Sequence, residues 1–153
     1  MRRAPTAARP VAAIEMPKEP TQALRFGKAR TARSAALLED YVGLIADLLA
    51  VHGEARATEV ANRLGVAHPT AVKSVARLKR EGLATARPYR GIFLTEAGRK
   101  LADRVRARHR LVVKSLLAVG VRAEAAEADA EGMEHYASEA TPKAFARFLA
   151  RSK

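Results

Sequence analysis

The sequence contains no cysteine and no tryptophan, and aromatic residues make up only 5% of its 153 residues. Without cysteine the chain forms no disulfide, no thiolate zinc site and no cysteine nucleophile. Because aromatic residues are so few, the core has to be built from Leu, Val, Ile and Ala. The lack of cysteine agrees with a reducing compartment, and we expect the protein to be cytoplasmic.

Long apolar runs are also lacking. Near the N-terminus the apolar stretch extends only from Val11 to Ile14 before Glu15 interrupts it. Such a stretch is too short for a signal peptide or a membrane span, so we expect no membrane partner. The length allows one domain of usual size, or a small domain with a helical appendage.

Acidic residues are the minority, at 16 against 28 Lys and Arg, and they are unevenly distributed. Residues 1–33 carry 8 basic and 2 acidic side chains, residues 34–122 carry 16 and 8, and residues 123–153 carry 4 and 6. The basic part predicts binding of a polyanion, and the acidic end suggests a role that involves cations. A basic protein with neither partner is the simpler alternative.

Residues 1–33 contain four of the seven prolines and show no sustained periodicity. We interpret them as a disordered basic arm. Ser34 is then placed to cap a first helix, whose apolar residues recur at helical spacing over 37–49 and which Gly53 ends.

The next segments predict a winged helix-turn-helix. A short helix over about 58–64 and a third helix from Pro69 to near Gly82 are joined by a turn at Gly65. The sequence "RPYRG" lies between two short apolar pieces and predicts a hairpin. Three helices followed by a two-stranded wing are typical of this DNA-binding unit, which we assign to residues 34–95.

On the third helix, Val72, Val75 and Leu78 are expected to face inward. The opposite stripe carries short hydroxyl and long cationic side chains, which suit base edges and phosphates in a major groove. The alternative is an ordinary solvated helix face. The candidate DNA-binding residues, wing included, are His68, Pro69, Thr70, Lys73, Ser74, Arg77, Arg87 and Arg90.

Residues 96–153 predict a helical second domain. A long helix starts at the cap Thr95 and runs to about Val119, a second covers 123–137, and a third opens at Thr141-Pro142. The fold class is therefore mainly α, with the winged helix-turn-helix followed by this helical domain.

The helix over 123–137 carries a line of potential metal ligands on one face. At ~100° per residue, the side chains fall within an arc about 100° wide. Like charges at this spacing repel, and Gly132 costs roughly 1 kcal/mol against alanine, so the stretch is poorly suited to be plain scaffold. A divalent cation would remove the repulsion. The five potential ligands are Glu124, Glu127, Glu131, Glu134 and His135.

Two more candidate ligands lie elsewhere. His109 lies among arginines in the long helix, and Asp40 lies at the polar edge of the first helix. Oxygen ligands with imidazole and no sulfur suit Mn²⁺ or Fe²⁺, and leave Zn²⁺ and Co²⁺ open. Each residue also has a structural alternative: His109 as a core histidine, and Glu124 and Glu127 as surface partners of nearby arginines.

Over residues 36–148 the chain resembles the manganese transport regulators, a branch of the diphtheria toxin repressor family. The resemblance is carried by "LLEDYVGLIADLL" (37–49), "EVANRLGVAHPTAVKSVARLKREGL" (59–83), "YRGIFLTEAGRKLA" (89–102), "RHRLV" (108–112) and "DAEGMEH" (129–135). It implies a homodimer that binds double-stranded operator DNA and represses manganese uptake genes, with the metal as co-repressor. The ligands it implies are Asp40, His109, Glu131, Glu134 and His135.

Two positions bear on the metal. Iron-responsive relatives have sulfur ligands where Asp40 and Glu131 stand here, so the carboxylates favour manganese. The manganese branch usually has a glutamate where this chain has Gly43. Asp47 lies on the same face but about 10 Å from Asp40 along the axis. We therefore hypothesise that the family's second metal position is weakened, filled by water or empty.

Two rival functions are weighed against this prediction. A metal-independent winged-helix protein would bind DNA regardless of chelator, with an affinity governed mainly by salt. A carboxylate-bridged enzyme would need Glu-x-x-His motifs on separate helices. Here Glu134 stands three residues after Glu131, and Arg106 stands three residues before His109, so we expect no enzyme.

Overall fold

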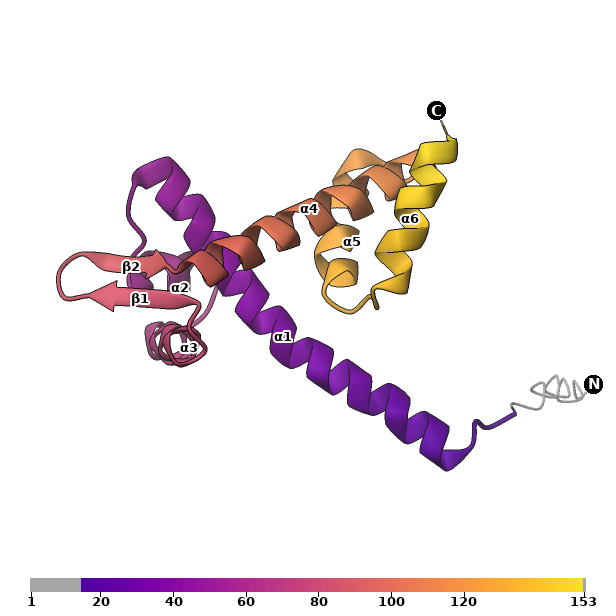
Figure 1. Cartoon of the computed structure of the whole chain (residues 1–153), viewed down its shortest axis with the longest axis horizontal. Coiled ribbons are helices and arrows are strands. Elements are labelled where there is room, and N and C mark those ends of the chain that lie inside the picture. Colours follow the sequence, from indigo (N-terminus) through magenta and orange to yellow (C-terminus); the bar gives the residue numbers. More distant parts are fainter. Residues whose placement is uncertain (1–14, 153) are drawn as a thin grey trace, which may run out of the picture.

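The computed structural model describes residues 15–152 and is built mainly of helices, with one two-stranded antiparallel sheet (Figure 1). The mainly α fold class is confirmed. The elements are α1 (Glu19–His52), α2 (Ala57–Leu64), α3 (His68–Arg80), β1 (Ala84–Arg87), β2 (Gly91–Leu94), α4 (Glu96–Ala118), α5 (Ala123–Glu134) and α6 (Ala140–Arg151).

The C-terminal half of α1 packs with α2, α3 and the hairpin around the larger hydrophobic core. Tyr41, Val42 and Ile45 recur at helical spacing on α1 and are fully buried, against Val60 of α2 and Leu78 of α3. Gly65, at φ 67°, makes the turn between α2 and α3, a conformation that glycine adopts without steric cost. The predicted winged helix-turn-helix outline is therefore present.

Two positions on α3 differ from the prediction. Ser74 is buried, with 8% of its surface exposed, whereas Val72 is 45% exposed. The inward face consists of Ala71, Ser74, Val75 and Leu78, which follow the i, i+3, i+4, i+7 spacing of a helix face. The hydroxyl of Ser74 is small enough to be accommodated on this buried face. Ser74 is therefore no longer a candidate DNA-binding residue.

The long helix α4 leads from the wing to the second half of the molecule, where α5 and α6 pack on it (Figure 1). Its first turn is capped by Thr95, whose Oγ1 accepts a hydrogen bond from the amide of Gly98 at 3.1 Å. At the other end, Val112 and Val113 form a second, smaller core with Ala126 and Ala130 of α5.

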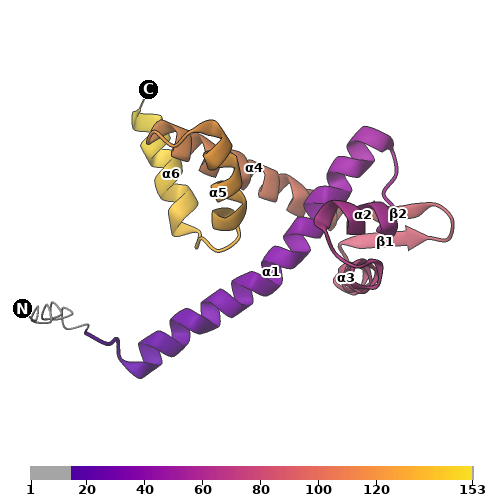
Figure 2. The ribbon, with the colours of Figure 1, turned by 180° about the vertical axis from the view of Figure 1, so that it is seen from behind.

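The predicted arm is partly wrong. Helix α1 begins at Glu19 rather than after Ser34, so residues 19–33 are helical, and the rest of the arm up to residue 14 lies outside the described residues. This segment is rich in Ala, Arg, Lys, Gln and Leu, which are good helix formers. Pro20 occupies the first turn, where its missing amide hydrogen costs nothing. Figure 2 shows this part of α1 projecting away from the other elements.

Two helix ends in the second half also shift. Helix α5 ends at Glu134, not at 137, and the α-helical pattern changes there: the amide of Tyr136 donates to the carbonyl of Met133, three residues back instead of four. Helix α6 begins at Ala140 rather than at Thr141, without a side-chain cap. Within residues 15–152, no helix is both long and apolar enough to cross a membrane.

Candidate metal centre and nucleic-acid interface

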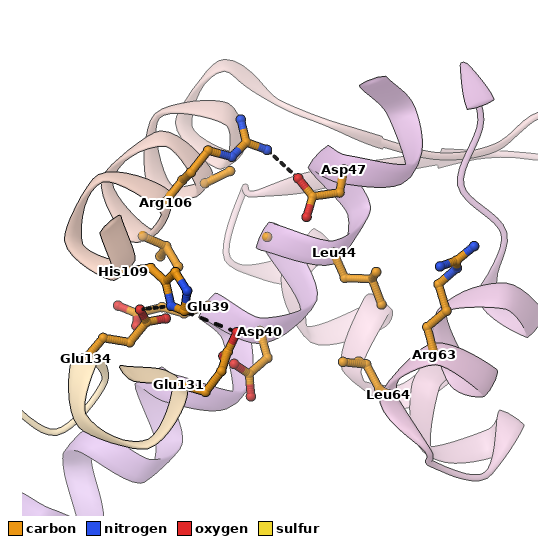
Figure 3. Close-up of a pocket in the computed structure, with 13 residues that line it drawn as sticks. Glu39, Asp40, Leu44, Asp47, Arg63, Leu64, Arg106, His109, Glu131 and Glu134 are labelled. Carbon is orange, nitrogen blue, oxygen red and sulfur yellow. Dashed lines mark hydrogen bonds and ion pairs between the residues drawn. The ribbon is translucent and has the colours of Figure 1, made fainter. Parts of the chain in front are cut away.

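The candidate metal ligands meet where α1, α4 and α5 approach one another, beside a cavity of about 580 Å³ (Figure 3). Asp40 comes from α1, His109 from α4, and Glu131 and Glu134 from α5, with His135 immediately after its last residue. The five residues predicted as ligands are therefore close together, although they are separated by up to 95 positions in the sequence.

The ligand atoms form two groups that share Glu131. One group is Asp40, Glu131 and His135, and the other is His109, Glu131 and Glu134. Within each group, the nitrogen and oxygen atoms all lie within 4.8 Å of one another. Three donors at this spacing are close enough together to hold one divalent cation. The side chain of Glu131 is 68% exposed, so the groups open to solvent on its side.

His135 is the most buried imidazole of the site, with 5% of its side chain exposed. Its Nδ1–H donates to Glu39 Oε2 at 2.6 Å. Its Nε2 lies 2.9 Å from Asp40 Oδ1 and 3.3 Å from Glu134 Oε1, yet this buried nitrogen forms no hydrogen bond with any described residue. Once it has lost its proton, Nε2 can bind a metal ion together with the carboxylates that it faces.

His109 contacts acidic residues through both ring nitrogens. Nδ1 lies 2.8 Å from Glu134 Oε2 and 3.9 Å from Glu131 Oε1. Nε2 lies 2.9 Å from Glu127 Oε2 on the other side of the ring. Nδ1 therefore faces the other candidate metal ligands. Nε2, on the opposite side of the ring, contacts Glu127, whose side chain is 63% exposed.

The pKa values reflect a site crowded with negative charge. Asp40 and then Glu39 raise the pKa of His135 to about 10, against the effect of burial. Burial lowers the pKa of His109, but Glu127 and Glu134 outweigh it and leave that pKa raised. Burial raises the pKa of Glu134 despite the two imidazoles. The carboxylates thus favour the protonated form of both imidazoles.

The donors fit a hard divalent cation. They comprise carboxylate oxygens and two imidazoles, with no sulfur, which suits Mn²⁺ or Fe²⁺ and also accommodates Zn²⁺. Gly43 lines the cavity, and a Cβ added there would meet nothing within 4 Å. Asp47, also on the cavity wall, pairs with Arg106 of α4 and takes no part in either group (Figure 3).

Sequence reasoning missed Glu39 and Arg108. Glu39 pairs with both His135 and the Arg108 guanidinium, and its side chain is only 14% exposed. Burial raises the pKa of Glu39, but His135 and Arg108 together outweigh it and hold the pKa below its usual value. Only the acidic pair Glu39-Asp40 could have hinted at this role. Of the five potential ligands on the acidic helix, Glu124 and Glu127 belong to neither group.

The candidate DNA-binding side chains lie on α3 and the wing. His68, Pro69, Thr70 and Lys73 are exposed on α3. Arg77 is half-buried: its Nε donates to Glu81 Oε1 at 3.0 Å and its guanidinium to Ser34 Oγ at 3.0 Å.

The wing tip presents a further group of exposed side chains. Arg87 and Arg90 are exposed there on either side of Tyr89, which is 99% exposed and adopts φ 63°. Sequence reasoning did not single out Tyr89.

Comparisons with known proteins agree with this arrangement. Residues 35–92 match the family "Iron dependent repressor, N-terminal DNA binding domain", and residues 95–153 match "Iron dependent repressor, metal binding and dimerisation domain". The Transcriptional regulator MntR of Escherichia coli O157:H7 is 49% identical over 123 residues, which cover 80% of this chain and 79% of that protein. The HTH-type transcriptional regulator MntR of Geobacillus kaustophilus is 38% identical over 102 residues, or 66% of this chain and 72% of that protein.

Solved structures give the same result. The structure of the manganese regulator SloR matches 74% of this chain with a TM-score of 0.65 and 26% identity. A manganese-dependent transcriptional repressor in complex with manganese matches 74% with a TM-score of 0.60 and 28% identity. The chain spans about half the length of these two structures, at 53% and 51%. The chain therefore belongs to the iron-dependent repressor family, also called the diphtheria toxin repressor family, on the branch of the MntR transcriptional regulators.

Proposed function

We propose that this chain is a manganese-responsive transcriptional repressor that binds double-stranded operator DNA as a homodimer and represses manganese uptake genes. The observation that carries the proposal is the meeting of Asp40, from the winged-helix half, with His135 and Glu131 of the second half. The family match to a DNA-binding domain followed by a metal-binding and dimerisation domain supports each part of it.

The proposed mechanism follows from the elements that carry the ligands. Bound Mn²⁺ would supply the positive charge that the clustered carboxylates lack, held by Asp40, His109, Glu131, Glu134 and His135. Asp40 lies on α1, whose C-terminal half belongs to the core of the winged helix, whereas Glu131 and Glu134 lie on α5. Because these carboxylates repel one another, the relative orientation of the two halves depends on whether their charge is neutralised.

In a two-fold dimer, that orientation sets the distance between the two α3 helices. Successive major grooves on one face of DNA are about 34 Å apart, so only one arrangement of the two halves places both helices correctly. A coupling of about 1–3 kcal/mol between metal and DNA is typical of such linkage, equivalent to roughly five- to 150-fold in affinity. Residues His68, Pro69, Thr70, Lys73, Arg77, Arg87 and Arg90 are the proposed DNA contacts.

The proposal also covers the kind of protein and its location in the cell. The metal-independent alternative is not favoured, because the MntR relatives and the metal-dependent repressor structures point to a metal-responsive regulator. The relatives are transcriptional regulators, and we propose that this chain is likewise not an enzyme. We place it in the cytoplasm, where operator DNA is found.

Operator binding with different metals tests the proposal. A duplex is selected from a random pool with manganese-loaded protein, and its affinity is then measured by fluorescence anisotropy with Mn²⁺, Fe²⁺, Zn²⁺ or chelator. We expect binding at least fivefold tighter with Mn²⁺ than with chelator. Equal affinity in chelator and Mn²⁺ would contradict the proposal and favour the metal-independent protein.

A further inference from the structure

Glu39 lies beside the candidate metal ligands without belonging to either group. Its Oε2 accepts the hydrogen bond from His135 Nδ1 at 2.6 Å and also pairs with the Arg108 guanidinium. The side chain of Arg108 is 26% exposed, and its Nε is buried without a hydrogen-bond partner among the described residues. One oxygen of Glu39 is therefore engaged by two groups, the guanidinium of Arg108 from α4 and the imidazole of His135 at the end of α5.

The two nitrogens of the His135 ring face different partners. Nδ1 is directed at Glu39, whereas Nε2 faces Asp40 at 2.9 Å and Glu134 at 3.3 Å. Only a deprotonated nitrogen offers a lone pair to a metal, so the location of the single proton in a neutral imidazole decides which nitrogen binds. A carboxylate on the far nitrogen of a metal-binding histidine fixes both the tautomer and the ring orientation.

We infer that Glu39 is a positioning residue, which keeps the proton of neutral His135 on Nδ1 and turns Nε2 towards the cation held with Asp40 and Glu131. The inference rests on the proposed function, because it presumes a cation in that group. It assigns to α1 a second contribution besides Asp40: the helix carries one ligand and also orients another ligand from α5.

Glu39 is a poor candidate for a metal ligand itself. Its Oε2 is already occupied by the His135 N–H, and the Arg108 guanidinium beside it would repel a divalent cation. Arg108 instead stabilises the carboxylate in the charged form in which it accepts the hydrogen bond.

Two substitutions of matched size test whether Glu39 positions His135 or has another role. Glu39→Gln and Glu39→Leu both remove the negative charge, so both change the competition between protons and metal at His135 in the same direction. Only the glutamine keeps an oxygen that accepts the Nδ1 hydrogen bond. By isothermal titration calorimetry without DNA, we expect Glu39→Leu to bind Mn²⁺ about 10- to 100-fold more weakly than Glu39→Gln. Glu54→Leu, at an exposed position on a loop, is the control and should bind Mn²⁺ like the wild type.

A measurement on the wild-type protein keeps the inference testable if Glu39→Leu fails to fold. With the diamagnetic ion Cd²⁺ bound, long-range ¹H–¹⁵N NMR reports which nitrogen of His135 carries the proton. We expect a proton on Nδ1 and metal on Nε2. Metal on Nδ1 would overturn the inference.

The two titrations also separate this inference from the proposed function. Equal Mn²⁺ affinity of Glu39→Gln and Glu39→Leu would overturn the inference, including the case in which both lose binding because Glu39 is a ligand. The proposed function would stand if the wild type still bound Mn²⁺. A wild type that bound no Mn²⁺ would contradict both.

Discussion

Glu134 is the most buried carboxylate of the candidate site, with 2% of its surface exposed. Its two oxygens contact different imidazoles, Oε2 at 2.8 Å from His109 Nδ1 and Oε1 at 3.3 Å from His135 Nε2. Burial of a carboxylate is costly unless positive charge accompanies it. Glu134 therefore links the two ligand groups, and a metal ion would stabilise its buried carboxylate in the charged form.

Replacing this residue by alanine tests its role as a ligand. We expect Glu134→Ala to abolish metal-stimulated operator binding while the protein remains a folded dimer, because the core residues of both halves are unchanged. Anisotropy with and without Mn²⁺ gives the first result, and sedimentation with circular dichroism gives the second. A normal response to Mn²⁺ in this variant would show that the ligand is assigned to the wrong residue.

Gly43 leaves open space on the wall of the cavity next to His109 and Glu131. We expect the wild type to bind one Mn²⁺ tightly per subunit. A Cβ at position 43 would have no atom within 4 Å, so we expect the side chain of Gly43→Glu to be accommodated. We expect this variant to bind a second Mn²⁺ tightly.

Isothermal titration calorimetry gives the number of Mn²⁺ ions that Gly43→Glu binds per subunit. Gly43→Gln is the control, because its side chain has the same size but is a weaker metal ligand. Two tight equivalents in the wild type would reject the hypothesis that the second position is weakened.

The junction between the wing and α4 depends on a close backbone contact. A Cβ built on Gly98 would lie 2.0 Å from the carbonyl oxygen of Leu83, and the amide of Thr95 donates to that same oxygen at 3.0 Å. The start of α4 is thus pressed against Leu83, the residue just before β1, and this contact fixes the angle between the wing and the helix.

We expect Gly98→Ala to lower the free energy of unfolding by about 1–3 kcal/mol, the usual cost of overpacking. Chemical denaturation measures it. Gly132→Ala in α5, where a Cβ meets nothing within 4 Å, is the matched control and should stabilise the protein by up to about 1 kcal/mol. A Gly98→Ala protein as stable as the wild type would show that the junction relaxes without cost.

Helix α1 shows where local sequence signals compete. The periodic apolar residues from 38 to 48 predicted the buried half correctly, because burial follows the helical period. Prolines and polar composition suggested that the preceding residues form no helix. The structure continues the helix back to Glu19, since Pro20 falls in its first turn and the residues after it favour helix.

On the scale of the whole molecule, the candidate site lies where α1 of the winged-helix half meets α4 and α5 of the second half (Figure 3). Its ligands come from three helices, so a cation that binds only the folded arrangement stabilises that arrangement. At a Mn²⁺ concentration 100 times Kd, the expected stabilisation is about 2.7 kcal/mol.

For a chain of this length we expect the Tm to rise by roughly 5–10 °C at that concentration. Differential scanning calorimetry with Mn²⁺ and with chelator measures the shift, and Glu134→Ala is the control that should lose most of it. An unchanged Tm in the wild type would show that the metal does not bridge the folded structure.

The sequence alone determined the features that depend on neighbours along the chain. The helical periods, the turn at Gly65, the wing and the grouping of Glu131, Glu134 and His135 at the end of α5 are all local patterns. Asp40 and His109 were candidate ligands by residue type, and the family resemblance joined them to this group. Only the tertiary structure decided which hydrogen bonds and ion pairs these side chains form. Glu39 and His135 are 96 positions apart and Glu39 and Arg108 are 69 apart, so no periodicity relates them. Contacts of that kind arise where α1, α4 and α5 meet, and the pairing of Asp47 with Arg106 likewise depends on α1 lying against α4. The burial of Ser74 was decided by the packing of α3 within the winged-helix half.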